Sequence, residues 1–70
     1  MVEVFKTNVS EKEIADMLRL SLERAFPACK INFDLHDCDR ILRLEGRGIC
    51  TKTVTGLLHT EGFECELLED

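Results

Sequence analysis

The sequence has no tryptophan, no tyrosine and only one proline, and its basic residues are not clustered. The nine lysines and arginines are scattered among 14 acidic residues, which gives a net charge of −5. This disfavours nucleic acid as a partner, because phosphate binding needs clustered lysine and arginine. No apolar run approaches the roughly 20 residues that a membrane-spanning helix requires. We therefore expect neither a nucleic-acid-binding protein nor a membrane protein.

Motifs of catalysis are also missing. No Ser-His-Asp or Cys-His pattern suggests a mechanism, and no glycine-rich loop after a strand carries a phosphate-binding lysine. The segment Gly46-Arg47-Gly48 is more typical of a turn before a helix than of a phosphate site. We therefore expect a protein that is not an enzyme and that uses no cofactor.

The N-terminus, MVEVFKTNV, has no basic region followed by an apolar stretch, so we do not expect a signal peptide. A cytoplasmic location is then the default, and thiols in that compartment are usually reduced. In a secreted domain, the four cysteines could instead form two disulfides, with three connectivities to choose from. The cysteines are widely spaced, at Cys29, Cys38, Cys50 and Cys65.

The residues that are present are typical of one small globular domain, spanning residues 1–70. The hydrophobic content of 44% is normal for a folded protein, even beside 33% charged residues. A chain this short buries only about 60% of the surface of its unfolded state, so we expect modest stability.

Alternation of apolar and polar residues predicts a first strand at residues 2–8, VEVFKTN. Val2 and Val4 share one face of this strand, and Glu3 and Phe5 share the other. We expect Phe5 on the face that is not covered by helices.

A helix is predicted from Ser10 to about Ala25, before Pro27. Ser10 and Glu13 have the spacing of a capping box, in which each side chain accepts a hydrogen bond from the other residue's backbone amide. The apolar stripe expected to face the core consists of Ile14, Met17, Leu18, Leu22 and Ala25.

Residues 29–46 predict a β-hairpin. A two-residue turn at Cys38 and Asp39 would collect apolar residues on one face, which is how register is normally set. This register pairs Leu35 with Leu42 and Phe33 with Leu44. A second helix at residues 51–60 and a last strand at residues 63–68 complete the order βαββαβ. We expect a ferredoxin-like α+β sandwich, with a four-stranded antiparallel sheet in the order 4-1-3-2 and both helices on one face.

Over nearly all of its length, the chain resembles the heavy-metal-associated domain of copper chaperones and metal-pumping ATPases. The segment LLHTEGFE is similar to the end of that family's second helix, and RILRLEG looks like its third strand. The family carries Gly-Met-x-Cys-x-x-Cys at the first strand-to-helix junction. Here Val9 stands where the family has its buried methionine, and Glu11 and Ile14 stand where it has its two cysteines.

The resemblance implies the family's fold without its copper site, because soft ions such as Cu(I) select thiolates. We therefore expect a non-enzymatic interaction or regulatory module that is a degenerate relative of metallochaperone domains. The alternative is a metal-ion binding or transport protein with an unconventional site made of Cys38, Cys65, His36 and neighbouring carboxylates. For Cys29 and Cys50, we expect positions at the edge of the core, with a redox-switchable disulfide as the alternative.

An interaction module needs a surface. Phe5, Ile41 and Leu68 are expected together on the open face of the sheet, where they would form an apolar patch. The partner would be an unknown protein, or a second copy bound through this face. The outer strand near KINFDLH also leaves an unpaired edge, where a partner strand could be added.

Overall fold

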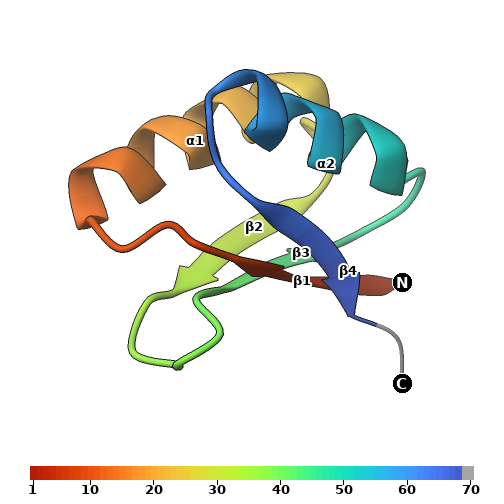
Figure 1. The fold of residues 1–70 in the computed structure, drawn as a ribbon. Helices are drawn as coiled ribbons and strands as arrows, with labels where there is room; N and C mark the ends of the chain where they lie inside the picture. The colour runs from red at the N-terminus through yellow and green to blue at the C-terminus, as the bar shows by residue number, and fades with distance from the viewer. Residues whose placement is uncertain (69–70) are drawn as a thin grey trace.

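The computed structural model of the chain describes residues 1–68. Its elements follow the order β1 (Val2–Thr7), α1 (Lys12–Ala25), β2 (Lys30–Asp34), β3 (Ile41–Glu45), α2 (Thr51–Thr60) and β4 (Cys65–Leu68). The four strands form one antiparallel sheet in the order β2-β3-β1-β4, and both helices cover one face of it (Figure 1). This confirms the predicted ferredoxin-like fold and its strand order. None of the helices in the described part is long and apolar enough to cross a membrane.

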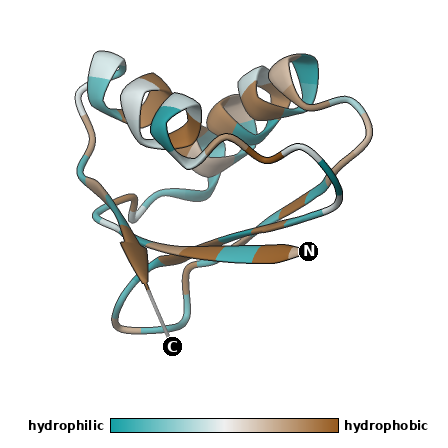
Figure 2. Ribbon diagram, turned by 90° about the vertical axis from the view of Figure 1, so that its right-hand side faces the viewer, coloured by the Kyte–Doolittle hydropathy of each residue, from teal (hydrophilic) through white to brown (hydrophobic). Residues whose placement is uncertain are grey.

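The core lies between the helices and the sheet. In Figure 2, hydrophobic stretches occur both in the helices and in the strands below them. Both layers contribute fully buried side chains, among them Leu22, Leu42, Leu44, Val54 and Leu58. The face of the sheet away from the helices is called the open face below.

The two faces of strand β1 are reversed relative to the sequence prediction: the face that carries Phe5 is covered by the helices, and the face that carries Val2 and Val4 is the open one. Phe5 is fully buried, and the prediction that it lies on the open face is wrong. Its Cα partners across the sheet are Leu42 on β3 and Leu67 on β4, which pack in or against the core. The reason lies in Lys6, which shares a face with Val4. Burying Val4 would also bury the ammonium group of Lys6, and unpaired charges are almost never fully buried.

Helix α1 begins one residue later than the predicted cap at Ser10 implies. Its N-cap is Glu11, no side chain caps it, and the amide of Ala15 donates to the carbonyl of Glu11 at 3.0 Å. The predicted capping box at Ser10 is therefore wrong. Upstream of this start, Val9 is fully buried and its amide donates to the Thr7 hydroxyl at 3.2 Å, so packing and a hydrogen bond position the chain before the helix.

The buried stripe of α1 is also narrower than predicted. Ala15, Leu18 and Leu22 are buried and Ile14 packs against the core, but Met17 is 61% exposed and Ala25 is exposed as well. The stripe therefore follows the side of the helix that touches the sheet, and Met17 lies outside it.

The β2–β3 hairpin has a longer loop than predicted. Phe33 is opposite Leu42 and Ile31 is opposite Leu44, so residues 35–40 form the connection. This register differs from the predicted one by two residues, which keeps every side chain on its expected face.

Hydrogen bonds within the loop explain the longer connection. Asp34 and Asp37 each accept a bond from the backbone amide two residues ahead, at 3.1 and 2.9 Å, which is a turn-forming pattern. Arg40 has the positive φ, 47°, and its guanidinium donates to the carbonyl of Leu35 at 2.7 Å. The two-residue turn at Cys38 and Asp39 is therefore wrong.

Removing the Phe5 ring tests the parity of β1. Phe5→Ala should lower the free energy of unfolding by about 3–5 kcal/mol, because it leaves a cavity in the core. Ile41→Ala on the open face is the control and should cost about 1 kcal/mol, since Ile41 is only half-buried. Urea denaturation followed by circular dichroism measures both values, and equal losses would contradict the burial of Phe5.

Candidate functional site

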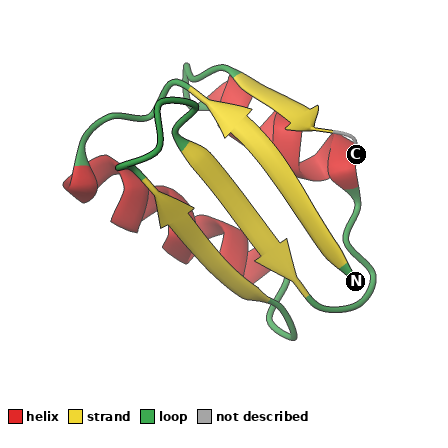
Figure 3. Ribbon diagram, turned by 90° about the horizontal axis from the view of Figure 1, so that it is seen from below, coloured by secondary structure: helices red, strands yellow, loops and turns green. Residues whose placement is uncertain are grey.

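The open face of the sheet carries a group of apolar side chains. β1 contributes Val2 and Val4, β3 contributes Ile41, and β4 contributes Leu68. Val4 lies directly opposite Leu68, and Ile41 is diagonal to Val4 because it pairs with Lys6. Figure 3 shows this face from below, with no helix in front of the strands. These four residues are called the open-face patch.

Two members of this patch were predicted and two were not. Ile41 and Leu68 lie on the open face, as expected, and Leu68 is 38% exposed. Val2, 44% exposed, and the half-buried Val4 take the place that Phe5 was expected to fill. The sequence feature that could have predicted their position is Lys6. It lies on the same face of β1 as Val2 and Val4, and its charge favours exposure of that face to water.

Charged residues of both signs surround the open-face patch. Lys6, Arg43, Glu45 and Glu66 are exposed on the same face. Lys6 Nζ lies 3.8 Å from Asp39 Oδ1, but both side chains are about half exposed, at 53% and 44%, so this pair adds little stability. An apolar centre with a polar rim is the composition of a protein-binding surface.

The first strand-to-helix junction is closed by hydrogen bonds. The Thr7 hydroxyl donates to the carbonyl of Arg40 at 2.6 Å and accepts from the amide of Val9 at 3.2 Å. The Thr7 amide donates to the carbonyl of Asp39 at 3.1 Å. These bonds join the hairpin loop to the end of β1 and hold Val9 in the core.

The positions of the metal clamp in the resembled family are Glu11 and Ile14. Glu11 is exposed at the N-cap of α1, and Ile14 is half-buried against the core. A carboxylate in water beside an aliphatic side chain offers no pair of soft ligands. Glu11 and Ile14 therefore provide no pair of thiolates at this junction.

The structure does not bring the alternative metal ligands together. Cys65 is 7% exposed on the helix-covered side of the sheet, whereas His36 and Cys38 are exposed in the hairpin loop. Within residues 1–68, the three donors that do lie within 4.8 Å of one another are those of Asp37, Cys38 and Asp39. Asp37 and Asp39 are neighbouring carboxylates of Cys38, of the kind expected for the alternative metal site.

The four cysteines are free thiols in different surroundings. Burial raises the pKa of the Cys65 thiol to about 11. The Cys50 thiol is exposed at the start of α2, where the side chain and then the amide of Thr53 lower its pKa. Cys29 is half-buried, with Sγ 3.6 Å from the carbonyl of Arg47. Cys29 packs against the core as expected, whereas Cys50 is exposed, so its expected position at the edge of the core is wrong. A disulfide between the two stays the alternative prediction.

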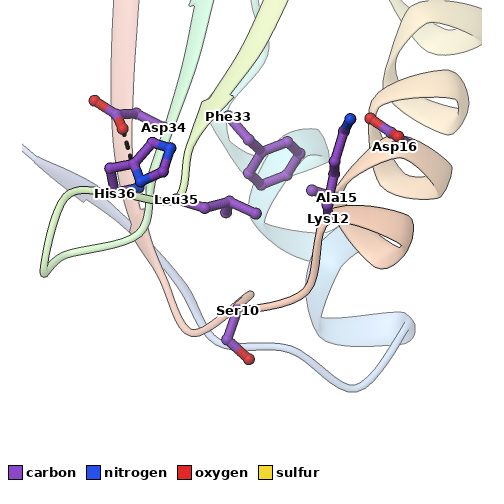
Figure 4. A pocket seen from close by; sticks show the side chains of 8 residues that line it. All are labelled: Ser10, Lys12, Ala15, Asp16, Phe33, Asp34, Leu35 and His36. Carbon is purple, nitrogen blue, oxygen red and sulfur yellow. Dashed lines mark hydrogen bonds between the residues drawn. The ribbon is translucent and has the colours of Figure 1, made fainter.

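Two grooves follow the outer edge of β2, beside α1. One has a volume of about 540 Å³ and lies between the end of β2 and the start of α1. Figure 4 shows the Phe33 ring and the Leu35 side chain in this space, with Lys12 and Asp16 on the helix beside it. The other groove, of about 390 Å³, lies farther along the same edge. Its lining includes Arg19, Glu23, Lys30, Ile31 and Asn32.

Comparisons with known proteins found no matching family model, no matching curated protein and no matching solved structure. Kinship with the heavy-metal-associated domains therefore stays a prediction.

The two pKa shifts predict selective thiol modification. At neutral pH, Cys50 should react with iodoacetamide faster than Cys65, because the thiolate is the nucleophile and more of it forms at the lower pKa. Raising the pH to about 9 should increase the rate at Cys50 while the folded chain still protects Cys65. Mass spectrometry of tryptic peptides over time measures both rates. Equal rates in the folded protein would contradict the burial of Cys65.

Proposed function

We propose that this chain is a non-enzymatic protein-interaction module that binds a partner protein through the open-face patch. The observation that carries the proposal is the direct pairing of Val4 with Leu68, beside the exposed Val2. Association would remove these apolar side chains from water and leave the charged rim to select the partner. The cytoplasm is the proposed compartment, because free thiols are typical of it.

The relation to metal carriers is part of the same proposal. A degenerate heavy-metal-associated domain would keep the scaffold and lose the cargo site. Glu11 and Ile14 support this idea, because they occupy the clamp positions without offering thiolates. The domain would then use its sheet to bind a partner protein, and other proteins would carry out copper transfer.

A charge placed in the open-face patch tests the proposal. Leu68→Lys should weaken binding of the partner by about tenfold or more, because docking would bury an unpaired ammonium group. The matched control is Met17→Lys, which places the same charge on an exposed apolar position of α1. The wild-type chain first captures partners from the native cell, and each purified partner is then titrated against the three proteins.

Two outcomes would contradict the patch. Either both lysine variants bind as tightly as the wild type, or both lose binding to the same extent. Thermal unfolding of each variant confirms that a loss of binding does not come from a loss of fold.

Metal binding at the hairpin loop is a second candidate function. The observation that favours it is the cluster of Asp37, Cys38 and Asp39, whose thiol and carboxylate donors suit Zn(II) better than Cu(I). Three donors would leave one coordination position for water or for a ligand from a partner.

A metal titration under reducing conditions separates the two candidate functions. For an interaction module, competition with a chelator should show no binding of Cu(I) or Zn(II) beyond that of an ordinary surface thiol. Tight one-to-one binding of Zn(II) that Cys38→Ser abolishes would favour the metal site instead. Cys50→Ser is the control, because it removes an exposed thiol outside the cluster.

A further inference from the structure

Within residues 1–68, strand β2 has one edge without a partner strand. Its five residues, Lys30–Asp34, pair with β3 on one side only, and the sheet ends there (Figure 3). The backbone N–H and C=O groups that point away from β3 are a template for another strand. The strand has no proline, and its register with β3 is continuous, so neither a proline nor a bulge blocks the edge.

The side chains of β2 are self-complementary around Asn32. Lys30 and Asp34 lie two residues on either side of it, exposed and on the open face. Suppose that β2 pairs antiparallel with β2 of a second copy, with the two Asn32 residues opposite each other. Lys30 of each copy then lies opposite Asp34 of the other copy, which gives two pairs of opposite charge. On the helix side, Ile31 then lies opposite Phe33 of the second copy. Both are favourable cross-strand pairs.

Only this register pairs the charges. Moving the centre of symmetry to Ile31 places Lys30 opposite Asn32 of the second copy. Moving it to Phe33 places Lys30 opposite His36 of the second copy. Both shifts lose the two pairs between lysine and aspartate. The charges of β2 therefore select one arrangement among those that the backbone allows.

The charges on helix α1 are also self-complementary, on the side of the helix that borders the two grooves. This side carries Lys12, Asp16, Arg19 and Glu23, so its charges alternate along the helix. A two-fold axis between Asp16 and Arg19 places Lys12 opposite Glu23, and Asp16 opposite Arg19, of the second copy. Within one chain, Arg19 lies 3.9 Å from Asp16 and 3.0 Å from Glu23. These pairs are partly exposed, so a second copy can join the network.

One axis serves both the strand and the helix. Lys12 and Asp16 line the groove beside residues 33–36, whereas Arg19 and Glu23 line the groove beside residues 29–32. The midpoint of the charges on α1 therefore lies beside the middle of β2, next to Asn32. An axis perpendicular to the sheet at this level relates both layers of one copy to those of the other.

We propose that two copies of this chain associate through β2, antiparallel and centred on Asn32, and that α1 of each copy faces α1 of the other across the same axis. The two four-stranded sheets would join into one continuous sheet. The half-buried Phe33 would lose more of its contact with water. Both open-face patches would lie on the same side of the dimer, free to bind another protein.

The other outer strand does not offer such an edge. Glu66 is the charged residue of β4 among Cys65–Leu68, and Glu64 precedes the strand. A second copy paired at β4 would bring carboxylates together with no basic residue of that strand opposite them, and like charges on facing strands are destabilising. The distribution of charge therefore favours β2.

Charge reversal tests the dimer without touching the open-face patch. Sedimentation of the wild type up to about 1 mM covers the range of weak specific association and gives the dissociation constant. Lys30→Asp should raise this constant by about tenfold or more, because it turns two attractive pairs into two repulsive ones. Asp34→Lys should do the same, and the double variant should restore the wild-type value. Lys30 and Asp34 are exposed, but Asp34→Lys also removes the bond that Asp34 accepts from the His36 amide. Thermal unfolding of each variant therefore shows whether a change in the dissociation constant comes from a loss of fold.

A disulfide reports the register directly. Residues facing each other in an antiparallel pair have Cα atoms about 4.5–5.5 Å apart, which a disulfide can bridge. Asn32→Cys should therefore form a covalent dimer with oxidised glutathione. Lys30→Cys is the matched control, because the two substituted residues would lie roughly 13 Å apart along the strands. An equimolar mixture of Lys30→Cys and Asp34→Cys should again give a covalent dimer.

Three results would overturn the proposal. The first is a wild type that stays monomeric up to about 1 mM. The second is a dimer whose dissociation constant does not change in either single charge-reversal variant. The third is cross-linking of Lys30→Cys as efficient as that of Asn32→Cys, with the wild type as the background for the native thiols. None of these results depends on the partner protein, so the dimer and the open-face patch can fail separately.

Discussion

The burial of Phe5 is the constraint on which the rest of the sheet depends. β1 lies in the middle of the sheet, and Phe5 faces Leu42 on one side and Leu67 on the other. Because successive side chains in a strand point to opposite faces, placing Phe5 inside sends Val4 and Lys6 outside. The same pairing places the neighbour of Leu42, Ile41, on the open face. The burial of the Phe5 ring thus determines which side chains lie on the open face, where a partner protein could bind them.

The same parity turns Thr7 inward at the end of β1. Its hydroxyl needs hydrogen bonds there, and it finds them at the carbonyl of Arg40 and the amide of Val9. A polar side chain in this position ties the hairpin loop to the junction before α1. At this junction, the hydrogen bonds of Thr7 hold β1, the hairpin loop and Val9 together.

The open-face patch and the outer edge of β2 would bind their partners through different interactions. The open-face patch offers apolar area with charges at its rim, so its free energy of binding would come mainly from desolvation. The outer edge of β2 offers backbone hydrogen bonds, and the charges of Lys30 and Asp34 choose the register. An axis perpendicular to the sheet keeps both patches on one side. A dimer would therefore present two binding surfaces to one partner, which raises avidity without any new contact.

The sequence by itself determined the order of the elements, the fold and the strand order, because hydrophobic periodicity and the handedness of crossovers leave few arrangements. It also placed Ile41 and Leu68 on the open face. It did not determine the parity of β1, where valines alternate with Phe5 and both faces look apolar, or the start of α1, where Ser10 has the pattern of a cap but no bond to make. The loop at residues 35–40 was decided only by tertiary structure. The physical reason is that pairing, burial and charge alignment depend on neighbours that are distant in the chain, such as Leu42 and Leu67 beside Phe5.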